Sequence, residues 1–150
     1  MDVAVVHYKV KAATRGDLRA HLGLCSSHFS PPLAERVDLD DYALKLFERS
    51  VTFEAWVGAD LLGLVAAYVN AGSERPTHVS SVSVAPTLAG QGVAFELMRR
   101  CLAYARDAGA RCVMLEVARA ALPARSLYRK LGFEPTGEHG DLLTMSLSLG

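Results

Sequence analysis

The sequence predicts an α/β protein with one mixed β-sheet, and the spacing and order of its apolar segments support this fold class. Segments with apolar residues at every second position alternate with segments in which they recur every three or four positions. Their order along the chain, β-α-α-β-β-β-α-β-α-β-β, is typical of helices packed on a sheet. With 150 residues, 51% hydrophobic and 21% charged, the chain can bury about 70% of the surface that it exposes when unfolded. We therefore expect residues 1–150 to form a single domain.

The N-terminal half is expected to contain a strand, two helices and a β-hairpin. Thr14 and Asp17 form a capping pair at the start of the first helix, and Asp38 opens an acidic first turn of the second. The expected elements are a strand at Val3–Val10, helices at 14–25 and Asp38–Arg49, and hairpin strands at Val51–Val57 and Leu61–Val69. Clusters of Ser, Gly and Pro predict loops at Ser26–Pro32 and Asn70–Thr77.

The C-terminal half is expected to contain two further helices and four strands. Val93, Leu97, Cys101 and Ala105 form one stripe of a long helix, which Gly109 ends. The expected elements are strands at His78–Val84, Arg111–Val117, Phe133–His139 and Leu142–Leu149, and helices at Gly90–Ala108 and Leu122–Leu131. Because the segment 111–117 is almost continuously apolar, we expect that strand to be covered on both faces.

The composition argues against several classes of protein. The formal net charge is +0 at pH 7, so no overall field attracts nucleic acid or an anionic membrane. The longest apolar run, Leu61–Val69, is much shorter than the roughly 20 residues of a membrane span, and no signal peptide is recognisable. The three cysteines show no CxxC spacing, which is typical of reduced thiols in a cytoplasmic protein. No spacing of His, Cys and Asp indicates a metal site.

The segment from Val82 to Phe95 leads from a strand through Gly90-Gln91-Gly92 directly into a helix. Unpaired amides at a helix N-terminus attract phosphate, and glycines let a diphosphate approach them closely. A plain turn is the simplest alternative. A dinucleotide-binding fingerprint is another, with Glu116 as the acid that would bind ribose. Phe95 at the third small position and the inserted residues 86–89 argue against that fingerprint.

A longer pattern, Val82-x-Val84-x-Pro86 followed by Gly90-x-Gly92-Val93-Ala94, resembles the signature of the GNAT superfamily, the GCN5-related N-acetyltransferases. The resemblance implies a three-layer α/β/α fold with a central mixed, mostly antiparallel sheet that is splayed between its fourth and fifth strands. Ala89 stands where the family has a Gln or Arg that assists the diphosphate grip.

A second motif supports the resemblance in the C-terminal half. Leu115-Glu116-Val117, Leu127-Tyr128 and Gly132-Phe133 are similar to the strand and helix that end in a leucine-tyrosine and a Gly-Phe in this family. Ala121 stands where the family usually has an asparagine. Two spaced motifs in the expected order extend the resemblance over nearly the whole chain.

The resemblance implies transfer of an acetyl group from acetyl-CoA, or from another short acyl-CoA, to a primary amine of a small molecule or protein, by direct attack in a ternary complex. The residues that it implies for cofactor binding are Val82, Ser83, Val84, Ala89, Gly90, Gln91, Gly92, Val93, Ala94 and Tyr128. The departures at Ala89 and Ala121 keep a rival function open, a non-catalytic module that binds or senses acyl-CoA.

Three residues are candidates for the chemistry. By resemblance, Tyr128 acts on the departing thiolate as the general acid. Full proton transfer from a free phenol to a thiolate is uphill by roughly 2 kcal/mol, so hydrogen bonding is the safer description of that role. A protonated amine must lose a proton, and Glu116 or His78 is the candidate base.

The acceptor site is implied only by position in the fold. The candidate acceptor-binding residues are His28, Phe29, Tyr42, Tyr68 and Asn70. The acceptor itself stays open between an amino sugar, a polyamine, an antibiotic, a free amino acid and a protein N-terminus. An exposed strand edge in the closing hairpin would permit a homodimer.

Overall fold

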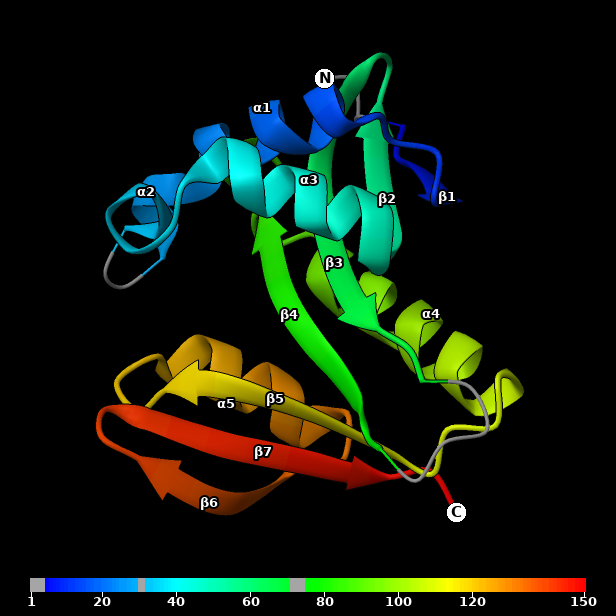
Figure 1. Cartoon of the computed structure of the whole chain (residues 1–150), viewed down its shortest axis with the longest axis vertical. Helices are drawn as coiled ribbons and strands as arrows, with labels where there is room; N and C mark the ends of the chain where they lie inside the picture. Colours follow the sequence, from blue (N-terminus) through cyan, green and yellow to red (C-terminus); the bar gives the residue numbers. More distant parts are fainter. Residues whose placement is uncertain (1–4, 30–31, 71–74) are drawn as a thin grey trace.

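The computed structural model describes residues 5–29, 32–70 and 75–150 (Figure 1). The strands are β1 His7–Val10, β2 Val51–Val57, β3 Asp60–Tyr68, β4 Thr77–Val84, β5 Cys112–Ala118, β6 Glu134–His139 and β7 Leu142–Ser148. The α-helices are α1 Arg15–Cys25, α2 Leu33–Arg36, α3 Leu39–Arg49, α4 Val93–Asp107 and α5 Leu122–Lys130. Short 3-10 helices are η1 Ser26–His28 and η2 Pro86–Leu88.

The strands form a seven-stranded sheet in the order β1-β2-β3-β4-β5-β7-β6. Neighbouring strands run antiparallel except β4 and β5, which are parallel. Helices α1 and α3 cover one face of the sheet, and α4 and α5 cover the other (Figure 1). This confirms the expected three-layer arrangement around a mixed, mostly antiparallel sheet. The mostly antiparallel sheet also differs from the parallel sheet of a dinucleotide-binding fold.

The predicted elements differ from the observed ones mainly at short segments. The first strand begins at His7, and residues 3 and 4 of the expected strand lie outside the described residues. Parts of the two expected loops, residues 30–31 and 71–74, also lie outside them. The one-turn helices η1, α2 and η2 were not predicted, because a single turn is too short to produce a helical period in the sequence.

The strand β5 is not covered on both faces, so that expectation was wrong. Val113, Leu115 and Val117 are buried on the side of α5, whereas Glu116 is exposed. Figure 1 shows no helix over the other face of β5 and β7. The apolar segment 111–117 therefore has one buried face and one that is only partly covered. Glu116 lies on the partly covered face.

The long helix α4 packs closely on the sheet because β3 has a glycine beneath it. A Cβ atom built on Gly63 would lie 2.9 Å from the Ala55 Cβ, 3.0 Å from the Val93 Cγ1 and 3.2 Å from a Leu97 Cδ1. The predicted stripe of α4 is buried as expected. Phe95, at the position where a dinucleotide fold needs a small residue, is instead 39% exposed.

Glu54 on β2 is a fully buried carboxylate that ties the chain before α1 to the sheet. Its oxygens accept hydrogen bonds from the Ala12 amide (3.1 and 3.2 Å), the Ala13 amide (3.1 Å), the Thr52 Oγ1 (2.6 Å) and the Trp56 Nε1 (3.0 Å). A buried carboxylate is tolerated when donors saturate its lone pairs in this way.

His21 on α1 joins that helix to β4. Its Nδ1 lies 2.8 Å from the Leu61 carbonyl oxygen and its Nε2 lies 2.8 Å from the Ser83 Oγ. A carbonyl only accepts, so Nδ1 carries the proton, and in the neutral ring Nε2 accepts a hydrogen bond from the Ser83 hydroxyl. Burial lowers the pKa of His21, which favours this neutral form.

We expect Gly63→Val to destabilise the protein by about 1–3 kcal/mol, because the added methyl groups would push α4 away from the sheet. Urea unfolding followed by circular dichroism would measure the change. Gly137→Val on the exposed strand β6 is the control, since the nearest atom to its Cβ is 3.7 Å away. Equal midpoints for the two variants would contradict this account of α4 packing.

We expect the free energy of unfolding to fall as the pH drops below about 6.5, in part because of His21. The pKa of His21 is lower in the folded protein, so the unfolded chain takes up this proton first and is favoured by acid. Urea titrations between about pH 5.5 and 7.5 should show a smaller decline for His21→Gln than for the wild type. The exposed His139→Gln should retain the wild-type slope, and the interpretation fails if His21→Gln also retains it.

Candidate active site

The strands β4 and β5 separate shortly after they meet. Their parallel pairing covers only Thr77–Val79 against Val113–Leu115. Beyond Val79, β4 continues alongside β3 to Val84 while β5 stays paired with β7, and Figure 1 shows β4 and β5 diverging. One edge of residues 80–84 is therefore free of a strand partner, and such an edge can pair with an extended chain that carries amides.

A β-bulge bends β4 where the separation begins. The register with β3 shifts so that Ala66 faces Ser81 and Ala67 faces Val79, which leaves Ser80 as the extra residue. Tyr42 on α3 holds this bulge, because its hydroxyl donates to the Ser80 carbonyl oxygen (3.2 Å) and lies 2.6 Å from the Ser80 Oγ. Tyr42, a predicted acceptor-site residue, is thus placed where it supports the bend in β4.

The loop before α4 presents amides that have no partner. Gly90 and Gly92 have φ angles of 77° and 74°, which favour glycine, and Gly92 caps α4 without a side-chain hydrogen bond. The first helical bond runs from the Glu96 amide to the Gly92 oxygen (3.0 Å), and within the described chain the amides of residues 92–94 have no backbone acceptor. A Cβ on either glycine would meet nothing within 4 Å. These features fit a diphosphate at the positive end of α4.

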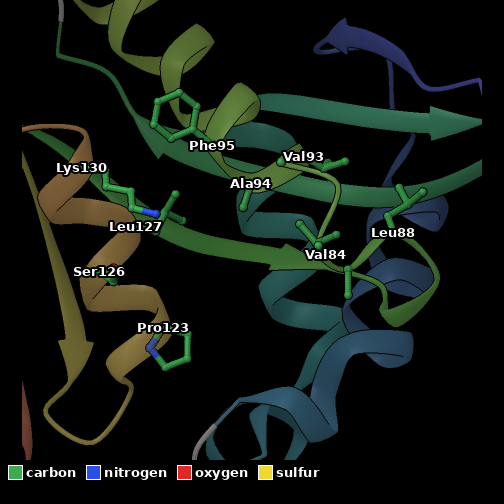
Figure 2. A pocket seen from close by; sticks show the side chains of 12 residues that line it. Val84, Leu88, Val93, Ala94, Phe95, Pro123, Ser126, Leu127 and Lys130 are labelled. Carbon is green, nitrogen blue, oxygen red and sulfur yellow. The ribbon is translucent and has the colours of Figure 1, made fainter.

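A cavity of about 530 Å³ lies between this loop and α5 (Figure 2). Its lining includes six of the predicted cofactor-binding residues, namely Val84, Ala89, Gly90, Gly92, Val93 and Ala94. Sequence reasoning missed the other lining residues, which are Leu88, Phe95, Pro123, Ser126, Leu127 and Lys130. The four on α5 follow the spacing i, i+3, i+4, i+7, so helical periodicity was a signal that could have found them.

Ala89 supplies no positive charge to the cavity, but Lys130 on the opposite side does. Lys130 lies on α5, facing the start of α4 in Figure 2. The predicted residue Gln91 turns away, because its Nε2 donates to the Thr87 carbonyl oxygen at 3.3 Å. Ser83 is likewise directed to His21 rather than into the cavity. A phosphate in this cavity would therefore meet backbone amides and one lysine.

A second cavity, of about 260 Å³, lies at the separation of β4 and β5. The residues that line it from the sheet are 79–82 of β4 and 115–118 of β5. Tyr128, His28, Phe29 and Arg36 contribute to its lining from the helices and the loop after α1. The structure thus brings the predicted residues Tyr128, Glu116, Val82, His28 and Phe29 into one cavity.

Tyr128 is held rigidly and remains protonated. Its side chain is 6% exposed, and its ring packs edge-on against Phe133 with the centroids 6.0 Å apart. Burial raises the pKa of Tyr128 to about 12. Within the residues described, no hydrogen bond engages its hydroxyl, so the group can act as a donor in the cavity.

Glu116 and His78, the two candidate bases, lie in different surroundings. Glu116 is exposed and lines the second cavity. Among the described residues it forms no ion pair, because Arg119 pairs with Glu138 at 3.0 Å and Arg125 donates to the Arg119 carbonyl oxygen at 2.8 Å.

His78 lies in the paired part of β4, opposite Tyr68 on β3 and Met114 on β5. Its ring stacks on that of Tyr68 with the centroids 6.2 Å apart, and the Lys45 Nζ lies 5.4 Å from the Tyr68 ring. Asn70 donates to the Pro76 carbonyl oxygen at 3.2 Å. Tyr68, Asn70 and His78 line neither of the two cavities.

No helix in the described parts of the chain has the length and apolar character needed to cross a bilayer. Across the same residues, His, Cys, Asp and Glu side chains nowhere gather in a group of three or more that could hold a metal ion.

Comparison with known proteins agrees with this geometry. The chain is 41% identical to streptothricin acetyltransferase from Streptomyces lavendulae over 86 residues, which are 56% of this chain and 44% of that protein. The chain thus spans less than half the length of that relative. A protein of the GNAT family from Desulfovibrio desulfuricans has the same fold, with a TM-score of 0.78 at 17% identity over 97% of this chain and 100% of the other.

The fold is also shared with yncA from Salmonella typhimurium, which was solved with its cofactor acetyl-CoA. Its TM-score is 0.73 at 19% identity, over 95% of this chain and 94% of the other. Residues 17–133 match the family described as Acetyltransferase (GNAT) family. That match includes both glycines of the loop, the separated strands and Tyr128, and the chain therefore belongs to the GNAT acetyltransferase family.

Proposed function

We propose that the protein is an N-acetyltransferase that transfers an acetyl group from acetyl-CoA, or another short acyl-CoA, to a primary amine in a ternary complex. The observation that carries this proposal is a pair of cavities, one beside the unpaired amides of the loop before α4 and the other at the separation of β4 and β5, where Tyr128 lines it. Membership of the GNAT family supports it. The yncA protein, which shares the fold, has acetyl-CoA as its cofactor.

The cavity beside the loop suits the acyl-CoA. The amides of residues 92–94 and the dipole of α4 would bind the diphosphate, with Lys130 opposite. The free edge of β4 near Val82–Val84 would pair with the amides of the pantetheine arm. One of its amides would also stabilise the negative charge that develops on the thioester oxygen.

Tyr128 would act by donating a hydrogen bond to the departing sulfur. As the amine nitrogen bonds to the acyl carbon, the C–S bond breaks and negative charge develops on sulfur. With the Tyr128 pKa raised to about 12 and a thiol pKa near 8.5, full proton transfer is uphill by about 5 kcal/mol. Hydrogen bonding to the sulfur therefore fits better than complete protonation by the phenol.

Glu116 is the better placed base. An amine with a pKa near 10.4 costs about 4–5 kcal/mol to deprotonate at pH 7, so a nearby acceptor for the proton is useful. Glu116 lines the same cavity as Tyr128, whereas His78 packs against Tyr68 outside it. We therefore assign the proton to Glu116, directly or through a water, and give His78 a packing role.

The domain organisation, the cellular location and the oligomeric state of the protein can also be inferred. We propose that residues 1–150 act as one acyl-CoA N-acyltransferase domain, supported by the continuous seven-stranded sheet. Two buried free cysteines and a half-buried third suit a cytoplasmic protein. The exposed edge strand β6 would permit a homodimer.

The alternative is a module that binds acyl-CoA without turnover. Ala89 offers no side chain to the diphosphate, and Ala121 lacks the amide that the family usually has there. Such a module would bind acetyl-CoA yet acetylate no member of a broad amine panel.

We expect calorimetric titration to detect binding of acetyl-CoA and no binding of NAD. Gly92→Trp should abolish the binding, because its ring would fill the space over the loop amides. Gly140→Trp is the matched control, since Gly140 also has a positive φ (60°) and a Cβ with nothing within 4 Å. Equal loss of binding in both variants, or binding of NAD instead, would contradict the placement of the diphosphate.

We expect Tyr128→Phe to lower kcat about a hundredfold while acetyl-CoA still binds. Because the pKa of Tyr128 is about 12, the phenol stays protonated at neutral pH, and the ratio of wild-type to variant rates should be constant from about pH 6 to 9. Thiol release measured across that range would test this, with the exposed Tyr104→Phe as control. A ratio that changes near neutral pH, or a fully active variant, would remove the assigned role.

A further inference from the structure

The second cavity presents two opposite charges that do not neutralise each other. Arg36, the last residue of α2, lines it from the N-terminal layer of helices, and Glu116 lines it from β5. In the described chain neither side chain is part of an ion pair. An acceptor with charges of both signs would complement this cavity better than a simple amine.

Arg36 is oriented although no carboxylate of the described residues pairs with it. Its guanidinium lies over the Phe29 ring, 5.7 Å from the centroid. The short helix α2 is fixed by the buried Leu33 and by a hydrogen bond from the Ala34 amide to the Ser26 Oγ (2.8 Å). A guanidinium stacked on an aromatic ring keeps its N–H donors free, and their fork matches the two oxygens of a carboxylate.

Arg36 lies near Tyr42, the residue that contacts the bulge in β4. Burial is the main cause that raises the pKa of Tyr42, and the positive charge of Arg36 acts in the opposite direction. Tyr42 in turn contacts Ser80, which lines the same cavity. Arg36 and the bulge residue Ser80 thus line one cavity, where the two strands separate.

The size of the cavity favours a small acceptor group. Its volume of about 260 Å³ is below the range of roughly 300–1,000 Å³ that is typical of pockets for drug-sized ligands. A small molecule that carries an amine and a carboxylate fits both the volume and the charges. A polyamine has no carboxylate and would leave Arg36 without a partner.

We propose that the acceptor is a free amino acid or a closely similar amino carboxylate, and that Arg36 determines this specificity by binding the carboxylate. This inference rests on the proposed acetyltransferase function. In the reaction the ammonium group of the acceptor first loses a proton to Glu116, the neutral nitrogen then bonds to the acetyl carbon as the C–S bond breaks, and a second N–H proton is released while CoA leaves as its thiol. Arg36 takes no part in these bond changes and positions the acceptor.

Thiol release with saturating acetyl-CoA would test the proposal on a panel of amino acids, each paired with its carboxamide. For the best acceptor we expect kcat/KM to be about tenfold to a hundredfold higher for the acid than for the amide, as charge-assisted hydrogen bonds imply. Arg36→Gln should remove this preference by raising KM for the acid with little change in kcat. Arg36→Lys should restore part of it, and Arg106→Gln, at an exposed site on α4, should change nothing.

Several outcomes would overturn the proposal. One is an equal kcat/KM of the wild type for acids and for their carboxamides. Another is an equal effect of Arg36→Gln on the kcat/KM of both. A third is a marked preference of the wild type for amines without a carboxylate. Unchanged binding of acetyl-CoA by Arg36→Gln would show that the variant is folded.

A further measurement separates this inference from the proposed function. If acetyl-CoA binds and no amine is acetylated, the catalytic proposal fails, and calorimetry with CoA present then tests acceptor binding alone. The assignment of Arg36 would still be supported if the wild type binds an amino acid but not its carboxamide, and if Arg36→Gln does not bind that amino acid. Absence of amino acid binding would overturn it.

Discussion

The short parallel contact between β4 and β5 is the constraint on which the rest of the structure depends. Three residue pairs join the strands before the bulge at Ser80 turns β4 away, while β5 pairs with β7 over its whole length. A longer contact would close the sheet and satisfy the free edge of β4, which would remove both the edge and the cavity between the strands. A shorter one would leave the two halves of the sheet without a common ladder.

An opening in a sheet persists only if the surrounding frame is rigid, and buried polar groups supply part of that rigidity. Glu54 fixes the segment before α1, and His21 fixes α1 to Ser83 on β4. Tyr42 fixes α3 to the bulge. Each contact joins the N-terminal helices to a strand, so β4 is held on the α1 and α3 side and stays free along the edge that faces β5. Removal of one partner from such a buried contact leaves an unsatisfied group, which is costly.

The sequence predicted the helices and strands well, because caps and apolar periods are local. Thr14 with Asp17 and Asp38 mark helix starts that the structure confirms. The separation of β4 from β5 has no local signal, since pairing depends on partners distant in sequence, and it was reached only through resemblance to a family. The segment of β5 is apolar on both faces except at Glu116, so the sequence predicts cover on both sides and does not reveal the open face around that residue. Arg36 lies in a one-turn helix after two prolines, where the sequence gives no period to follow.

The two cavities have no lining residue in common. For the proposed reaction this has a kinetic consequence, since the diphosphate end of acyl-CoA would lie in the first cavity and only its thioester end would reach Tyr128 in the cavity of the acceptor. With the diphosphate end outside the cavity of the acceptor, we expect no compulsory order of addition. Either product could also depart first, and the turnover rate would then depend on whichever release is slower rather than on a fixed sequence of steps.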